Sequence, residues 1–254
     1  MDAKELDVDL NSRVTGIPDQ VVLQRTVSHF RNIHSTAALE YCGHRVVNSY
    51  RSISICGDKL MGTLELVRHG VPTPRTRLAF TEEAALKSMD ELGYPVVLKP
   101  VVGSWGRFVS LLKDKDAARA VLEHREYMFP LYQVYYVQEY VKRPPRDIRS
   151  FVVGGRTVAA IYRISPPSSE DWRTNTARGG RAEACKIGKE LDELSLKAAE
   201  ATNTDIAGVD LMETEAGMVV HEVNGTTEFK NTVPATGVDI PALIVDYLAS
   251  IQKK

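Results

Sequence analysis

The stretch Gly208-Val-Asp-Leu-Met-Glu-Thr-Glu-Ala-Gly-Met-Val-Val-His-Glu-Val-Asn224 decides the fold of this chain, because it predicts a β-hairpin. Two apolar-rich runs, 207–213 and 218–224, have the length and composition of strands. Between them, Glu215-Ala216-Gly217 is typical of a turn. The stretch therefore predicts an antiparallel pair of strands near the end of the chain.

The same hairpin carries polar side chains that suit a metal ion. Folding about Ala216 places Asp210 opposite Glu222, and Glu222 shares a strand face with Asn224. Two carboxylates and a carboxamide oxygen are hard donors, so they predict Mg²⁺ bound together with phosphate, and not zinc or an iron–sulfur cluster. Alternation predicts that His221 points away from this face, as a structural residue. The alternative is an ordinary hairpin whose polar edge faces water.

Composition excludes several classes of protein. The chain has 254 residues, with 33 acidic and 32 basic side chains, so its overall charge favours neither nucleic acid nor a membrane surface. No apolar run approaches membrane-spanning length. Three cysteines without C-x-x-C spacing predict neither a disulfide framework nor a zinc site. We expect a cytoplasmic protein.

The order of elements predicts α+β layers rather than a doubly wound sheet. Hairpins are interspersed with single helices, which does not match a regular βαβ series. Residues 165–182 lack periodicity and predict a long functional loop. We expect helices over 29–41, 59 to about 69, 81–92, 115–125, 188–202 and 239–252, and strands over 94–99, 108–112, 135–141, 147–153 and 156–163.

A lysine and a glycine-rich loop predict a phosphate-binding segment. Lys99 ends a strand, and its ammonium group could hold phosphate as a point charge. Two glycines and an arginine in the following loop would bring backbone amides and a guanidinium to phosphate oxygens. The alternative is a surface turn with its tryptophan packed on the core. The loop consists of Gly103, Ser104, Trp105, Gly106 and Arg107.

Three further segments have polar groups suited to a nucleotide or a substrate. The strand end Gln138, Glu139, Tyr140 and Val141 could offer backbone groups to adenine and a carboxylate to ribose; an ordinary strand end is the alternative. Arg173, Asn175 and Arg178, in the long loop, could neutralise a transferring phosphoryl group; the alternative is a solvated basic loop. Directly after the metal strand, Thr226, Thr227, Glu228, Phe229, Lys230 and Asn231 could bind a small substrate, or form a surface turn.

In this order, the motifs resemble the ATP-grasp ligases, most closely the RimK-like branch and within it the LysX group of lysine biosynthesis. The resemblance extends from about residue 20 to 250. It rests on Lys59, Val97-Leu-Lys-Pro100, Gly103-Ser-Trp-Gly-Arg107, Val137-Gln-Glu-Tyr140, Asp147-Ile-Arg149, Arg173-x-Asn-x-x-Arg-Gly-Gly180, Asp210 and Glu222-x-Asn224.

The resemblance implies an ATP-dependent carboxylate–amine ligase that works through an acyl phosphate. It implies that Lys59, Lys99 and the glycine loop bind phosphates, and that the hinge after residue 137 binds adenine. It further implies that Asp147 and Arg149 contribute to the ATP site and Arg163 to the substrate site. The hairpin set would hold two Mg²⁺ ions, with Mn²⁺ as a possible substitute, and Arg178, Asn175 and Arg173 would surround the acyl phosphate.

The substrates implied by the LysX group are 2-aminoadipate and a small acidic carrier protein, in a homo-oligomeric enzyme. Related ligases use glutamate, and one methylene is worth only ~1–3 kcal/mol of discrimination. One alternative is a RimK-type glutamate ligase that modifies a ribosomal protein or a cofactor. An alternative of another class is a catalytically silent ATP-binding module.

The expected fold is ATP-grasp, with two α+β subdomains gripping ATP, preceded by a shortened N-terminal α/β domain. Residues 1–55 would be the remnant of that domain, 56–142 the small subdomain with its hinge, and 143–254 the large subdomain. Relative to the family pattern, Met1 stands where the opening strand and helix should already have finished. Loss of a central strand would expose sheet edges.

Overall fold

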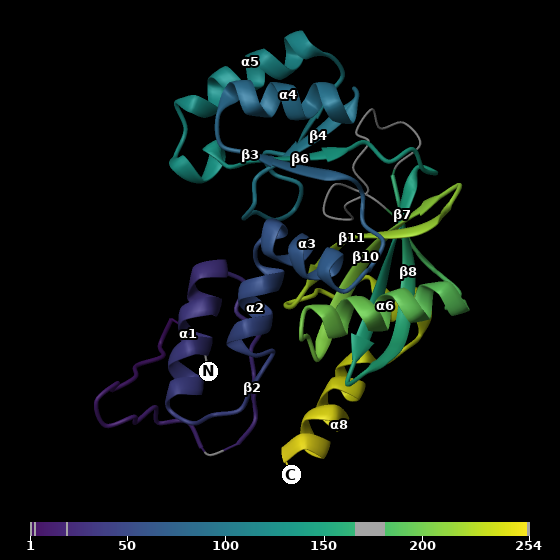
Figure 1. Cartoon of the computed structure of the whole chain (residues 1–254). Helices are drawn as coiled ribbons and strands as arrows, with labels where there is room; N and C mark the ends of the chain where they lie inside the picture. The colour runs from purple at the N-terminus through teal and green to yellow at the C-terminus, as the bar shows by residue number, and fades with distance from the viewer. Residues whose placement is uncertain (1, 3, 19, 166–180, 253–254) are drawn as a thin grey trace.

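The computed structural model describes residues 2, 4–18, 20–165 and 181–252, which form a four-stranded sheet, a five-stranded sheet and a smaller N-terminal lobe (Figure 1). In this lobe, β1 (Val22–Leu23) pairs in parallel with β2 (Val46–Val47), and α1 (His29–Tyr41) connects them. The predicted helix over 29–41 is confirmed. A further helix, α2 (Tyr50–Cys56), was not predicted; it is short and begins at Ser49, whose side chain accepts from Ser52 N.

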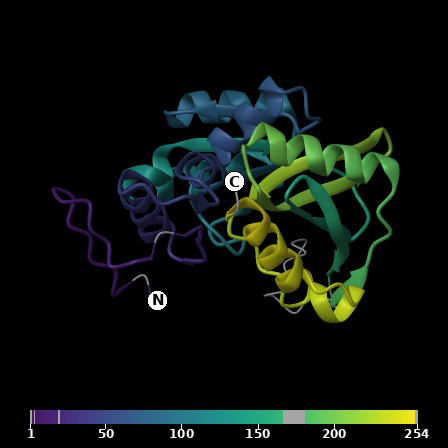
Figure 2. The ribbon, with the colours of Figure 1, turned by 90° about the horizontal axis from the view of Figure 1, so that it is seen from below.

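The N-terminal lobe lies against the C-terminal helix α8 (Ile240–Gln252), as Figure 2 shows from below. Arg45 Nη1 donates to Ile251 O at 3.2 Å, and Val21 N donates to Gln252 Oε1 at 2.5 Å. After α2 the chain enters α3 (Lys59–Arg68), capped by Asp58, whose carboxylate accepts from Leu60 N and Met61 N. The cap matters for the site, because it places Lys59 in the first turn of the helix.

The four-stranded sheet carries two helices on one face, α4 (Glu82–Leu92) and α5 (Lys115–Glu126) (Figure 1). Its strand order is β3-β6-β4-β5, and neighbouring strands are antiparallel. Thr81 Oγ1 accepts from Ala84 N, so Thr81 caps the helix that the sequence predicts over 81–92. The strands are β3 (Thr76–Ala79), β4 (Val96–Lys99), β5 (Ser110–Leu112) and β6 (Tyr135–Glu139), with a 3-10 turn at Pro130–Gln133.

The five-stranded sheet has the order β11-β10-β7-β8-β9 and is antiparallel throughout. Its strands are β7 (Arg146–Val153), β8 (Arg156–Ile164), β9 (Arg181–Ala184), β10 (Ile206–Thr214) and β11 (Gly217–Asn224). The prediction of a loop over 165–182 is wrong for 181 and 182, which belong to β9. This strand is polar and lies at the sheet edge, so it has no apolar periodicity that the sequence could display.

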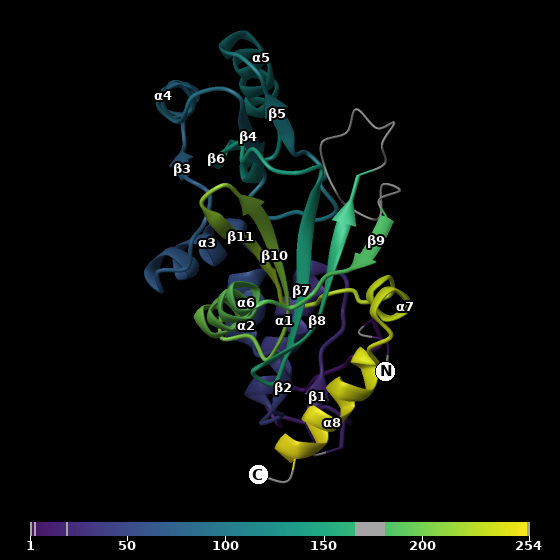
Figure 3. The same ribbon diagram turned by 90° about the vertical axis from the view of Figure 1, so that its right-hand side faces the viewer.

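Helices cover both faces of the five-stranded sheet (Figure 3). On one face, Ile148 and Val152 pack with α6 (Lys189–Ala201). On the other, Phe151 and Val153 pack with α7 (Thr232–Thr236) and α8. The mixture of helices and antiparallel strands confirms the α+β class. No helix in the described part of the chain is both long and apolar enough to cross a membrane.

The predicted hairpin over 207–224 is confirmed, but its turn is shorter than expected. Thr214 pairs with Gly217, so only two residues form the turn, and this register would place Asp210 opposite His221. An irregularity next to Asp210 shifts the register by one residue, and Asp210 pairs with Glu222 as predicted. A β-bulge therefore produces the predicted pairing, with His221 as the extra residue.

Candidate functional site

Asp210, in the middle of β10, is buried and paired with two arginines. Arg149 donates to both oxygens of Asp210, from Nε at 2.6 Å and from Nη2 at 2.7 Å. Arg163 Nη2 lies 3.1 Å from Asp210 Oδ2. Burial would raise the pKa of Asp210, but the charges of Arg149 and Arg163 outweigh burial and hold this pKa well below its usual range. Asp210 is therefore ionised at neutral pH.

Asp147 and Arg163, predicted to contact cofactor and substrate, form a second buried pair beside Asp210. Arg163 Nε donates to Asp147 Oδ1 at 2.6 Å, and both residues are buried. Burial would lower the pKa of Arg163, but Asp210 and Asp147 outweigh it and raise this pKa above its ordinary value. These contacts hold Arg163 against Asp210, so its guanidinium orients that carboxylate.

Glu222 and the glycine loop are joined by one side chain, that of Lys59. Lys59 Nζ lies 3.3 Å from Glu222 Oε1 and donates to Gly103 O at 2.8 Å. Just before the loop, Val101 O accepts from Lys59 N at 2.8 Å, which ties this part of the chain to the start of α3. The structure thus brings the predicted phosphate loop and the predicted metal strand within reach of the same ammonium group.

Lys99 is a buried cation at the end of β4. Its Nζ donates to Gln138 Oε1 at 2.6 Å, so the predicted lysine and the first residue of the predicted hinge are in direct contact. Gln138 Nε2 in turn donates to Thr76 Oγ1 at 3.0 Å, which fixes the carboxamide. Burial, together with the nearby charges of Lys59 and Arg143, lowers the pKa of Lys99 to about 8, although Glu222 opposes this shift.

Positive charge exceeds negative charge around these residues. Arg143, which the sequence analysis missed, lies close enough to influence the pKa of both Lys99 and His221. Its Nε is buried without a hydrogen-bond partner in the described part of the chain. A buried donor without a partner is costly, so this one is poised for an acceptor on a ligand. Five cations face three carboxylates here, which suits a polyanion: Lys59, Lys99, Arg143, Arg149 and Arg163 against Asp147, Asp210 and Glu222.

His221 lies on the site and not away from it, so its predicted orientation is wrong. The bulge interrupts the alternation of side chains, and His221 lines a small cavity together with Lys59 and Glu222. Burial, and after it the charge of Lys99, keeps the pKa of His221 well below its ordinary value, so the imidazole is neutral. Neither ring nitrogen has a hydrogen-bond partner among the described residues.

The donor set of the hairpin is compatible with Mg²⁺. Among the described residues no cluster of three or more His, Cys, Asp and Glu side chains forms a metal site. The predicted set has two carboxylates and a carboxamide, and Asn224 Nδ2 donates to Gly208 O at 3.3 Å. Asp210 Oδ2 faces both arginines, but Asp210 Oδ1, which accepts from Arg149 Nε, and Glu222 Oε1, which lies near Lys59, each retain a lone pair for a cation. The oxygen donors therefore fit a hard divalent ion.

The glycine loop does not bury its tryptophan, so the alternative of a turn packed on the core is wrong. Trp105 is 51% exposed, and Arg107 stacks on its ring with Cζ 5.0 Å from the centroid. Trp105 and Gly106 both have positive φ, at 57° and 65°. The loop also borders a cavity of about 800 Å³ through Ser104 and Trp105. It therefore lies between this cavity and Lys59.

The other residues predicted for the site lie at the end of β6, after β11 or outside the described part of the chain. Glu139 Oε1 accepts from Arg75 N at 2.8 Å, so this carboxylate closes the end of β6. Tyr140 and Val141 follow the strand and lead toward β7. Arg173, Asn175 and Arg178 lie outside the described residues. The segment 226–231 comes shortly after β11, as the sequence indicates. The side chain of Thr227, in this segment, lies against Gly208.

Thr227 and Gly208 are in such close contact that only glycine fits at 208. A Cβ on residue 208 would lie 2.1 Å from Thr227 Oγ1, and Thr227 is buried. We expect Gly208→Ala to displace Thr227 and the segment after it, to lower turnover at least tenfold, and to destabilise the fold by about 1–3 kcal/mol through overpacking. ADP release and thermal unfolding measure the two effects.

The matched control is Gly188→Ala, because a Cβ there would meet open space at an ordinary φ. This control should keep wild-type turnover. Wild-type turnover and stability in Gly208→Ala would contradict the tight contact.

Comparisons with known proteins bear on the family of this chain. A model of the RimK-like ATP-grasp domain matches residues 56–248. The α-aminoadipate–LysW ligase LysX of Saccharolobus solfataricus is 40% identical over 234 residues, which cover 91% of this chain and 84% of that protein. The glutamate–LysW ligase ArgX of Sulfurisphaera tokodaii is 36% identical and covers 90% and 81%. The crystal structure of a RimK domain ATP-grasp protein from Sphaerobacter thermophilus superposes with a TM-score of 0.73 at 25% identity, covering 97% and 87%.

Proposed function

This chain belongs to the RimK-like ATP-grasp family, and we propose that it joins the amino group of 2-aminoadipate to a carboxylate of a small acidic carrier protein. It is an ATP-grasp ligase. The observation that carries the proposal is the position of Lys59, which touches the glycine loop and Glu222 at once. One cation can then meet the phosphates of a nucleotide while the donors of the hairpin lie beside it.

The reaction would proceed in two steps that this site can support. A carboxylate oxygen of the carrier attacks the γ-phosphorus of ATP, the bond to ADP breaks, and an acyl phosphate forms. The amino group then attacks the acyl carbon, loses a proton, and phosphate leaves with the former carboxylate oxygen. Lys59, Lys99 and Arg143 would compensate the charge on the phosphates and hold them in line.

Asp210, Glu222 and Asn224 would hold Mg²⁺, as two ions, with Mn²⁺ as a substitute. The ions, when bound, neutralise phosphate charge. Arg149 and Arg163 would keep Asp210 ionised and oriented. Gln138 to Val141 would receive adenine beside Lys99. We also assign the acyl phosphate to Arg178, Asn175 and Arg173, on the strength of the family motif.

The choice of 2-aminoadipate over glutamate follows the higher identity to LysX than to ArgX. The segment 226–231 would bind the amino acid, because it follows the metal strand and is packed onto Gly208. The cavity of about 800 Å³ beside Trp105 has room for an amino acid and the end of a protein chain.

We expect ADP release from Mg-ATP to require both 2-aminoadipate and a carrier, because an acyl phosphate forms only on the carboxylate and is consumed only by the amine. The assay couples ADP to a spectroscopic signal, with LysW of Saccharolobus solfataricus as the carrier. Mass spectrometry of the carrier should show the mass of one 2-aminoadipate residue added.

Glutamate replaces 2-aminoadipate in a parallel reaction, and kcat/KM should be about tenfold lower, which corresponds to one methylene. A larger kcat/KM with glutamate would contradict the substrate assignment. ADP release at the full rate without carrier would refute the carrier ligase as a whole.

A further inference from the structure

The N-terminal lobe reaches across to the proposed substrate segment through Arg25. Arg25 follows β1, more than two hundred residues before the segment that it contacts. Arg25 Nη1 donates to Thr227 O at 2.8 Å, and Nη2 donates to Glu228 Oε1 at 3.1 Å. Its Cζ also lies 5.0 Å from the centroid of the Phe229 ring. One guanidinium thus engages three consecutive residues.

Two asparagines of the same lobe extend this contact. Asn32 Nδ2 donates to Thr226 Oγ1 at 2.9 Å, and Asn32 is buried in α1. Asn48 Nδ2 donates to Gly225 O at 2.6 Å. The lobe therefore contacts every residue from 225 to 229, starting immediately after the proposed metal ligand Asn224. The conformation of the segment depends on the N-terminal lobe as well as on its own sequence.

We propose that Arg25 is a positioning residue for the amino acid substrate, which sets the conformation of 226–229. This inference rests on the proposed function, since it takes that segment as the part that binds the amino acid. Arginine suits the role because its planar fork donates to a carbonyl and a carboxylate at once while its face stacks on a ring. Lysine has a single point charge and cannot make all three contacts together.

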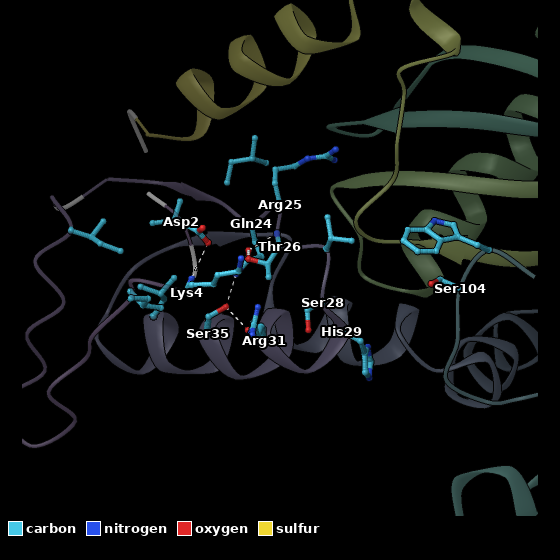
Figure 4. A pocket seen from close by; sticks show the side chains of 17 residues that line it. Asp2, Lys4, Gln24, Arg25, Thr26, Ser28, His29, Arg31, Ser35 and Ser104 are labelled. Atoms are coloured by element: carbon cyan, nitrogen blue, oxygen red, sulfur yellow. Dashed lines mark hydrogen bonds between the residues drawn. The ribbon is translucent and has the colours of Figure 1, made fainter. Parts of the chain in front are cut away.

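The geometry separates Arg25 from the nucleotide. Arg25 contacts Thr227, Glu228 and Phe229, whereas Lys59 and Lys99 contact the glycine loop, Glu222 and Gln138. Figure 4 shows Arg25 extending toward the C-terminal half of the chain, while Arg31 stays beside Ser35 on α1. Loss of Arg25 should therefore affect the amino acid and not ATP.

Arg25→Ala is expected to raise KM for 2-aminoadipate about tenfold, which is the size of one lost hydrogen bond to a charged group. KM for Mg-ATP should stay within about twofold of wild type. Arg25→Lys should recover part of the loss in KM for 2-aminoadipate. The matched control is Arg13→Ala, because Arg13 is another arginine of the N-terminal lobe that stacks on an aromatic ring, with Cζ 4.7 Å from the centroid of Tyr41; its two KM values should both be wild type.

Thermal unfolding is measured for each variant, and if Arg25→Ala does not fold, the same pair of KM values for Arg25→Lys decides. Equal changes in both KM values, or no change in either, would overturn the positioning role. A wild-type enzyme that releases no ADP with 2-aminoadipate and LysW refutes the proposed function instead. An active wild type with an unaffected Arg25→Ala refutes only the role of Arg25.

Discussion

Asp210→Asn should abolish turnover and also destabilise the protein. The carboxylate neutralises Arg149 and Arg163 in a buried environment, and an asparagine NH₂ would face their donors. Loss of one partner from a buried ion pair costs about 3–5 kcal/mol. For a chain of this size that corresponds to a fall in Tm of roughly 10 °C or more. ADP release, measured at a temperature where circular dichroism shows the variant folded, separates the loss of chemistry from the loss of fold.

Glu213→Gln is the matched control for Asp210→Asn. Glu213 lies on the same strand and forms a similar two-bond pair with Arg146, at 2.7 Å and 3.0 Å, but both side chains are partly exposed. An exposed pair contributes at most about 1 kcal/mol, so this variant should keep its Tm and its turnover. A folded Asp210→Asn enzyme with near-normal turnover would eliminate Asp210 from the metal site.

Lys99→Met should weaken ATP binding strongly while changing the stability of the fold little. An apolar side chain of similar length removes the cost of a buried charge, but it also removes the hydrogen bond to the buried Gln138 Oε1, and these two effects oppose each other. The variant would lose the charge-assisted contact to phosphate that we propose for Lys99, worth about 1.5–3 kcal/mol, so the Kd for Mg-ATP should rise roughly tenfold to a hundredfold. Isothermal titration with Mg-ATP measures the Kd, and thermal unfolding reports the stability.

The pH dependence of binding distinguishes this charge from a merely structural role. The pKa of Lys99 in the free protein is about 8, so raising the pH through 8 removes its proton before ATP binds. The wild-type Kd should therefore be constant below about pH 7 and rise above about pH 8 until it approaches the Kd of Lys99→Met. Lys99→Met should not show this rise.

Lys115→Met serves as the control for Lys99→Met. Lys115 forms an exposed ion pair with Asp90 on the outer helices of the four-stranded sheet, so this variant should bind Mg-ATP as wild type does. A wild-type Kd in Lys99→Met, or a pH profile that Lys99→Met leaves unchanged, would show that another cation holds the phosphates.

Local sequence patterns predicted most of the fold, because they encode local physics. The helices predicted from residues 59 and 81, the strand that ends at Lys99 and the two strands of the hairpin all follow from start signals, breakers and periodicity over a few residues. Elements with weak local signals were missed. β3 has four residues and β9 is a polar edge strand, and both exist because a neighbouring strand offers backbone partners.

The candidate site also combines residues that local patterns reveal with residues that only the tertiary structure brings in. The chemical types of its ligands, hard oxygen donors beside lysines and a glycine loop, can be recognised in the sequence. The residues that join them could not be recognised there. Arg143 lies in a loop without a motif, and Arg25 reaches residues more than two hundred positions away. Such contacts depend on how separate layers pack, and no local pattern records that packing.

The pairing of Asp210 with Glu222 shows what the sequence and the tertiary structure each determine within one hairpin. Sequence alone specified two strands, the turn between them and three oxygen donors, because alternation and turn propensity act within a few residues. The tertiary structure supplied a two-residue turn and a bulge at His221, which together restore the pair. The bulge brings a neutral histidine into the site, a consequence of strand register and packing that alternation cannot express.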